Sequence, residues 1–140
     1  MSYVNLMAHG VWGTKNRHPF LTNELRREVC AHIKENAKTK GIYIDTINGH
    51  TDHLHALMSL KPDLSISTQM QLIKGESAHW INLNKFLKVH FGWPSEYYAE
   101  SVNPHELDRI RAYINNQEEH HRKISFKEEY ENFMKGISRL

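Results

Sequence analysis

The pattern of apolar and polar residues predicts a strand and then a helix at the start of the chain. Residues 3–14 mix apolar and polar types and predict a first strand. Leu25, Val29 and Ile33 are spaced by four, so residues 22–40 predict an amphipathic helix. The chain therefore opens with one element of each kind.

A β-hairpin is predicted after this helix. Residues 42–47 predict a second strand and residues 53–60 a third. Asn48-Gly49 lies between them and is a strong turn signal, so the two strands should pair antiparallel. Residues 65–87 then predict a second helix.

The following segment predicts a short strand and a third helix. Residues 91–102 hold several turn residues and end in a segment that suits a short strand. Asn103 suits a helix N-cap, because Pro104 follows it and Glu106 lies three residues later. This helix should run to about residue 118.

A last helix is predicted from Ser125, with Phe126, Tyr130, Phe133 and Ile137 as an apolar stripe at helical spacing. The full order is β-α-β-β-α-β followed by helices. This is the ferredoxin-like order of an α+β fold, an antiparallel sheet with helices on one face, extended by C-terminal helices. We expect a single domain over residues 1–140, with a helical extension from about residue 120.

The composition excludes some classes of protein but does not indicate a binding partner. The chain of 140 residues has a net charge of +2, which is weak evidence for any polyanion. No apolar run approaches the roughly 20 residues of a membrane span, and no secretory signal is visible. Cys30 is the single cysteine, which excludes an internal disulfide and suits the cytoplasm. The eleven histidines are more informative, because several are closely spaced.

Two of these histidines occupy alternate positions of the predicted third strand. His53 and His55 share one face, whereas Leu54 and Met58 share the other, which should pack on the helices. Two imidazoles on one face can converge on a divalent cation. The alternative is a pair of solvent-facing histidines on the open side of a half-covered sheet.

A second candidate pair lies on the predicted third helix. Tyr113 and Gln117 are four residues apart and share a helix face. A tyrosine hydroxyl can act as a covalent nucleophile, and an amide oxygen suits Mg²⁺ or Mn²⁺. The alternative is an interface tyrosine and a solvated glutamine. The neighbouring His120 and His121 could touch DNA or the edge of the metal site, but ordinary surface positions are expected for both.

Taken together, these motifs resemble a known family. Asp52 followed by His53-Leu54-His55 fits a His-hydrophobic-His (HUH) motif, and the Tyr-Ile-x-x-Gln helix lies downstream at a suitable distance. The ordered set resembles the single-tyrosine HUH transposases of small bacterial insertion sequences, the transposase A type. His-x-His alone is a weak signal, whereas the ordered set is specific.

Other segments support the resemblance. Residues 11–17 are similar to the family's first strand and basic turn, residues 73–77 to its second helix, and residues 93–98 to its approach to the last strand. The likeness covers roughly residues 3–118. Thr51 departs from it, since a proline commonly stands there, and this should alter the turn and not the ligands.

The resemblance implies a reaction on single-stranded DNA that carries hairpins. Tyr113 would attack the scissile phosphate and form a 5′-phosphotyrosine, while His53, His55 and Gln117 would hold one Mg²⁺ or Mn²⁺. It also implies a homodimer in which the tyrosine helix can be exchanged between subunits. Candidate DNA-binding residues are Lys15, Arg17 and Lys74 for phosphates, and Trp93 and Tyr97 for stacking on bases.

The sequence is also compatible with three other functions. One is a domesticated HUH nickase that acts on repeated palindromes, and another is a non-catalytic module that binds single-stranded nucleic acid. The third is a small metal phosphohydrolase. Hydrolases of the His-x-His-x-His type need a third histidine on the same face, and Leu57 stands at that position.

Overall fold

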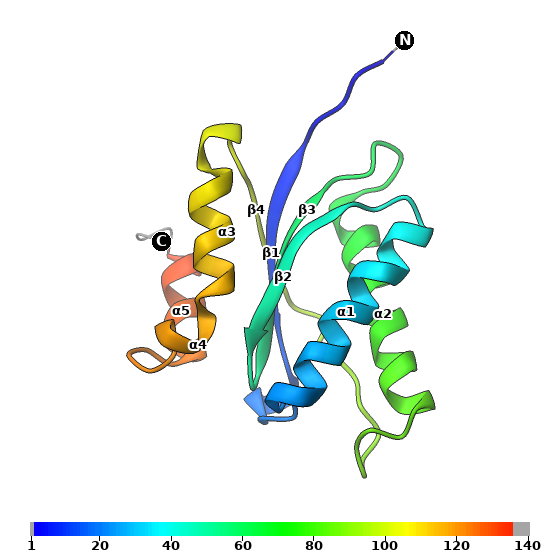
Figure 1. Ribbon diagram of the computed structural model, residues 1–140, viewed down its shortest axis with the longest axis vertical. Coiled ribbons are helices and arrows are strands. Elements are labelled where there is room, and N and C mark those ends of the chain that lie inside the picture. Colours follow the sequence, from blue (N-terminus) through cyan, green and yellow to red (C-terminus); the bar gives the residue numbers. More distant parts are fainter. Residues whose placement is uncertain (1, 136–140) are drawn as a thin grey trace.

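A four-stranded antiparallel sheet lies between two layers of helices in the computed structural model, which describes residues 2–135 (Figure 1). The strands are β1 (Met7–Gly13), β2 (Ile44–His50), β3 (His53–Ser59) and β4 (Tyr98–Ser101), in the sheet order β2-β3-β1-β4. The helices are α1 (Asn23–Thr39), α2 (Ile66–Leu83), α3 (Leu107–Asn115), α4 (Gln117–His120) and α5 (Phe126–Met134). This arrangement confirms the predicted ferredoxin-like order.

Local sequence signals account for where the helices begin and end. Thr22, Ser65 and Ser125 precede α1, α2 and α5, and each side-chain oxygen accepts a hydrogen bond from a backbone N–H of the first turn. Gly41 follows α1 with a φ of 76°, the left-handed conformation that lets a chain leave a helix. The capping residues thus set the lengths of the elements around the sheet.

The main core lies on the side of the sheet covered by α1 and α2. Leu54 and Met58 of β3 are fully buried there, together with Trp12 of β1 and Met70 of α2. Their alternation along β3 confirms the predicted assignment of the two faces. One consequence is that His53 and His55 lie on the opposite face.

That opposite face is also covered. Helices α3, α4 and α5 form a second layer over it (Figure 1), and Leu57 packs against Ile110 and Ile114 of α3. His53 and His55 are 0% exposed. The interpretation of a solvent-facing histidine pair on an open sheet is therefore wrong, because the C-terminal helices bury it.

The predicted hairpin turn at Asn48-Gly49 is wrong. Strand β2 continues through both residues to His50, and Thr51 and Asp52 form the turn. Gly49 pairs with Leu54 so closely that a Cβ atom at Gly49 would lie 2.1 Å from the His53 carbonyl oxygen. Gly49 therefore allows β2 and β3 to approach closely and does not form a turn.

The third helix is shorter than predicted. It ends at Asn115, and Asn116 has a φ of −102° and a ψ of 22° between α3 and the short helix α4. Ile137 of the predicted last stripe lies outside the described residues. Within residues 2–135, no helix is long and apolar enough to cross a membrane.

Candidate active site

Strand β3 holds His53 and His55 with their Nε2 atoms in one small volume. The Nδ1 atom of His53 lies 2.8 Å from a carboxylate oxygen of Asp52, and the Nδ1 atom of His55 lies 2.8 Å from Nε2 of His9. Such contacts fix the orientation of an imidazole ring. Both Nε2 atoms are left to face the centre of the site.

Gln117 lies beside these imidazoles despite the break between α3 and α4. Its Oε1 atom is 3.0 Å from Nε2 of His53 and 3.0 Å from Nε2 of His121. Its amide nitrogen donates to the carbonyl oxygen of Tyr113 at 3.2 Å, and the residue is fully buried. The structure therefore brings the predicted ligand Gln117 to the histidine pair.

A carboxylate that sequence reasoning missed occupies the centre of the site. Glu129 of α5 is 2% exposed, and its Oε1 atom lies 3.1 Å from Nε2 of His55 and 3.5 Å from Nε2 of His53. A signal for it was available, because Glu129 is three residues after Phe126 and four before Phe133. It therefore lies on the buried face of the predicted helix.

His121 also belongs to this group, so the expected surface location is wrong and the alternative, a position at the edge of the metal site, agrees with the structure. Its side chain is 3% exposed and its Nε2 atom is 3.3 Å from Glu129. One ligand atom from each of His53, His55, His121 and Glu129 lies within 4.8 Å of all the others. Because these donors converge and two imidazoles are anchored through Nδ1, the group fits a divalent cation.

The electrostatics favour neutral imidazoles at His53 and His55 beside a charged carboxylate, whereas the pKa of His121 is lowered by burial but raised overall by its hydrogen bond to Glu129. Burial lowers the pKa of His55 to about 4 and that of His9 to about 3, and it lowers the pKa of His53 as well. Burial alone would raise the pKa of Glu129, but hydrogen bonds from His121 and His55 hold it well below its usual range. Neutral imidazole nitrogens and a carboxylate are the protonation states that bind a metal.

Tyr113 faces the same group from α3. Its hydroxyl donates a hydrogen bond to the carboxylate of Glu129 and lies 3.3 Å from Nε2 of His120. Its ring meets the ring of His55 edge-on, with the centroids 5.6 Å apart. Burial and the negative charge of Glu129 raise the pKa of Tyr113 above its ordinary value, so the hydroxyl is protonated at neutral pH.

A buried histidine pair, an amide oxygen and a tyrosine hydroxyl thus meet under the C-terminal helices. The family model described as "Transposase IS200 like" matches residues 2–117 of this chain. The chain belongs to the IS200-like transposase family. An IS200-like transposase is an enzyme that acts on DNA, so the group around His53 is its candidate active site.

Curated relatives and solved structures agree with this family. The transposase is 26% identical over 117 residues to the ISDra2 transposase TnpA of Deinococcus radiodurans, which covers 80% of this chain and 84% of that protein. It is 27% identical over 119 residues to the transposase for insertion sequence element IS200 of Salmonella typhimurium. That match covers 81% of this chain and 77% of the relative.

Two solved structures are similar to this transposase. A crystal structure of a candidate transposase from Deinococcus radiodurans has a TM-score of 0.67 at 27% identity, covering 84% of this chain and 95% of that one. A REP-associated tyrosine transposase bound to a REP hairpin has a TM-score of 0.63 at 17% identity. That match covers 86% of this chain and 72% of the other. The second likeness concerns the fold alone.

The predicted DNA-binding residues of the transposase fall into two groups. Lys15 and Arg17 are exposed in the turn after β1, where Asn16 and Arg17 have φ values of 56° and 54°. Both cations line the same pocket near the end of β1. They are free of ion pairs within the described residues and can contact phosphates.

Lys74, Trp93 and Tyr97 of the transposase are partly used for packing. The Lys74 ammonium donates to the Ser95 carbonyl oxygen at 3.2 Å and lies 5.7 Å from the centroid of the Tyr97 ring. The Trp93 indole N–H donates to Ser77 at 2.9 Å. These contacts hold the segment before β4 against α2.

Proposed function

We propose that this transposase cleaves and rejoins single-stranded DNA through a covalent bond to Tyr113, with Mg²⁺ or Mn²⁺ held by His53, His55 and Gln117. The observation that carries the proposal is that the Tyr113 hydroxyl, His53 and His55 all contact one carboxylate, that of Glu129, and that Gln117 contacts His53 beside it. A nucleophile and a cation site that serve one phosphate must lie this close together.

The proposed reaction balances without a cofactor that supplies energy. A bond forms between the Tyr113 oxygen and phosphorus, and the bond from phosphorus to the 3′ oxygen breaks. Tyr113 loses one proton and the 3′ oxygen gains one, so the products are a 5′-phosphotyrosine and a free 3′-OH. Attack by another 3′-OH on the phosphotyrosine rejoins strands without ATP.

Each protein group has a defined task in this proposal. His53, His55 and Gln117 bind the cation, which supplies charge neutralisation on a non-bridging phosphate oxygen. Asp52 and His9 orient the two imidazoles through their Nδ1 atoms. Glu129 and His120 are the polar groups in contact with the Tyr113 hydroxyl, and they hold it toward the site.

The nitrogen and oxygen atoms around the proposed cation site indicate which metal it prefers. Imidazole nitrogens favour transition metals, whereas carboxylate and amide oxygens suit Mg²⁺ and Mn²⁺. With two or more imidazoles beside Gln117 and Glu129, we propose that Mn²⁺ binds more tightly than Mg²⁺. A titration of the purified protein with each ion tests this order.

We propose hairpin-bearing single strands as the DNA partner and a homodimer as the working form in the cytoplasm. The REP-associated transposase of the same fold was solved with a REP hairpin, which supports the first part. Within one chain, Arg111 of α3 contacts Asp45 of β2 at 2.8 Å. In a homodimer that exchanges the tyrosine helix α3, the same contact would form between α3 of one subunit and β2 of the other. Lys74, Trp93 and Tyr97 stay predicted DNA contacts.

A labelled-strand experiment tests the proposed chemistry. End-labelled single strands from the flanks of the element are incubated with Mn²⁺ or Mg²⁺ and analysed on denaturing gels. Wild type and the control Tyr43→Phe should form a protein–DNA adduct that chelation abolishes, whereas Tyr113→Phe should form none. An adduct that survives Tyr113→Phe would overturn the assignment of the nucleophile.

A further inference from the structure

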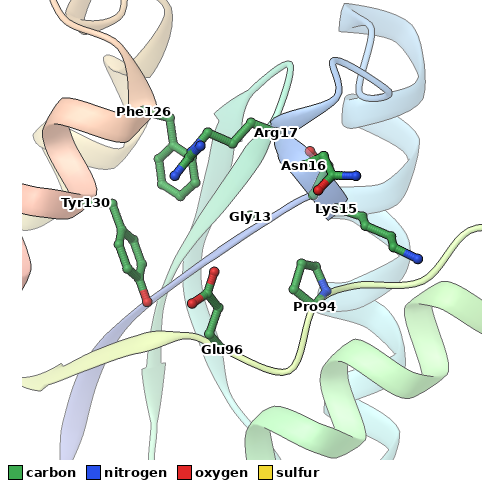
Figure 2. Close-up of a pocket in the computed structure, with 9 residues that line it drawn as sticks. Gly13, Lys15, Asn16, Arg17, Pro94, Glu96, Phe126 and Tyr130 are labelled. Atoms are coloured by element: carbon green, nitrogen blue, oxygen red, sulfur yellow. The ribbon is translucent and has the colours of Figure 1, made fainter.

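A pocket lies beside the cation site and has no role in the reaction described above. It encloses about 270 Å³ between the turn of residues 15–17 and helix α5 (Figure 2). This volume is just below the roughly 300–1,000 Å³ of drug-sized ligand sites. The pocket therefore suits a single small group such as one nucleotide.

The aromatic ring of Phe126 separates this pocket from a proposed cation ligand. It lines the pocket and also stacks on the ring of His53, with centroids 4.1 Å apart and an interplanar angle of 2°. Gly13 makes this placement possible, because a Cβ atom there would lie 2.6 Å from Phe126. Only the Phe126 ring therefore lies between a nucleotide in the pocket and His53, a proposed ligand of the cation.

The lining combines three kinds of chemistry. Lys15 and Arg17 bring positive charge to the rim, and Phe126 and Tyr130 of α5 bring aromatic rings. Cations that follow a phosphate backbone together with rings that stack on bases are typical of single-strand binding. An apolar ligand without phosphate would make no use of the two cations.

Glu96 adds a hydrogen-bond acceptor at the other side of the pocket. Its carboxylate is exposed, and in Figure 2 the Tyr130 hydroxyl points toward it. A carboxylate accepts hydrogen bonds from the exocyclic amino group of a base such as cytosine. Thymine has a carbonyl oxygen at the corresponding position and would be repelled.

We propose that this pocket binds one unpaired nucleotide of the substrate strand, next to the phosphate that is cleaved, and that Glu96 selects cytosine over thymine there. The inference rests on the proposed function, since it assumes a single strand at the cation site. Stacking on Tyr130 supplies affinity without sequence preference, and the Glu96 carboxylate supplies the discrimination.

Binding of oligo-dC and oligo-dT, each of about 15 nucleotides, tests the discrimination by fluorescence anisotropy. The protein carries Tyr113→Phe and the buffer contains EDTA, so neither cleavage nor a metal is needed. We expect oligo-dC to bind about three- to ten-fold more tightly, the effect of one hydrogen bond. Glu96→Gln should bring the ratio close to one, whereas Glu28→Gln on α1 should leave it unchanged.

The possible outcomes separate the pocket assignment from the proposed cleavage chemistry. Equal affinity for the two strands, or a cytosine preference that persists in Glu96→Gln, removes the proposed role of Glu96. Free dCMP that binds as tightly as oligo-dC would make the pocket a mononucleotide site. Failure of the adduct experiment with an intact cytosine preference would reject the cleavage chemistry and leave the pocket assignment standing.

A second experiment tests the position of the nucleotide. Once the adduct gel has mapped the cleaved phosphate, an abasic residue is placed at each flanking position in turn. We expect one flanking position to lower wild-type adduct formation, and Tyr130→Leu to be insensitive to the same change. Equal sensitivity of wild type and Tyr130→Leu at every position would contradict the placement.

Discussion

Oε1 of Glu129 lies 3.1 Å from Nε2 of His55, although 74 positions separate the two residues. The family match ends at residue 117, so Glu129 and His121 come from a segment outside it. The site of this transposase is therefore covered and supplemented by its own C-terminal helix α5.

Replacing the carboxylate of Glu129 should destabilise the metal-free protein. Glu129→Gln keeps the size of the side chain but loses hydrogen bonds between a charged group and the surrounding imidazoles and hydroxyl. We expect the free energy of unfolding to fall by about 1–3 kcal/mol, measured by urea denaturation in EDTA. The exposed neighbour Glu131→Gln should change it little, and equal effects of both variants would contradict the central position of Glu129.

Cation binding should stabilise the protein through His55. At a Mn²⁺ concentration of about 100 times Kd, linkage adds roughly 2.7 kcal/mol, which raises Tm by several degrees. In His55→Ala most of this increase should be lost, whereas the exposed His105→Ala should keep it. A thermal shift in His55→Ala equal to that of wild type would show that the cation binds elsewhere.

Two glycine-to-alanine changes should act in opposite directions. At Gly49 the new Cβ would lie 2.1 Å from the His53 carbonyl oxygen, so Gly49→Ala must push β2 from β3. We expect a loss of about 2–3 kcal/mol in the free energy of unfolding. At Gly75, inside α2, no described atom beyond the neighbouring residues and the helix backbone lies within 4 Å of the new Cβ, and Gly75→Ala should stabilise by about 0.5–1 kcal/mol. Similar effects of both would refute the close approach at Gly49.

The contact between α3 and β2 should make stability depend on pH in acid. The hydrogen bonds from Arg111 lower the pKa of Asp45 to about 2. An unfolded aspartate titrates near pH 3.9, so the stabilisation is complete above that value and is lost as pH falls through about 2. Asp45→Asn should therefore be less stable than wild type at about pH 6, and the difference should shrink by about pH 2.5.

A matched control exists for this prediction. Asp108 also contacts Arg111 at 2.8 Å, but its side chain is 98% exposed. Exposed pairs contribute little, so Asp108→Asn should resemble wild type at both pH values. If Asp45→Asn and Asp108→Asn behave alike, the pairing of α3 with β2 contributes nothing measurable to stability.

Several features of the site follow from local sequence patterns. The alternation along residues 53–60 predicts that His53 and His55 share the face opposite Leu54 and Met58, and the structure has this arrangement. Side chains alternate because of backbone geometry, which needs no knowledge of the rest of the chain. Capping residues such as Ser125 predict helix starts for the same local reason.

Local signals failed where distant segments impose the conformation. Asn48-Gly49 has the composition of a hairpin turn, yet its residues continue β2. There Asn48 donates to the Ile114 carbonyl oxygen of α3 at 3.1 Å, and Gly49 allows β3 to approach. The pairing of whole strands and the docking of α3 outweigh the preference of two residues.

Local patterns along the chain were enough to predict the order of elements, the shared face of the histidine pair and the family resemblance carried by Tyr113 and Gln117. The completion of the site by Glu129 and His121, and the contact through which His9 orients His55, come from tertiary packing. These contacts depend on how α5 docks through Phe126 and Phe133 against the sheet. The spacing of apolar residues along the chain does not predict how α5 packs on the sheet, because that packing joins segments that are far apart in sequence.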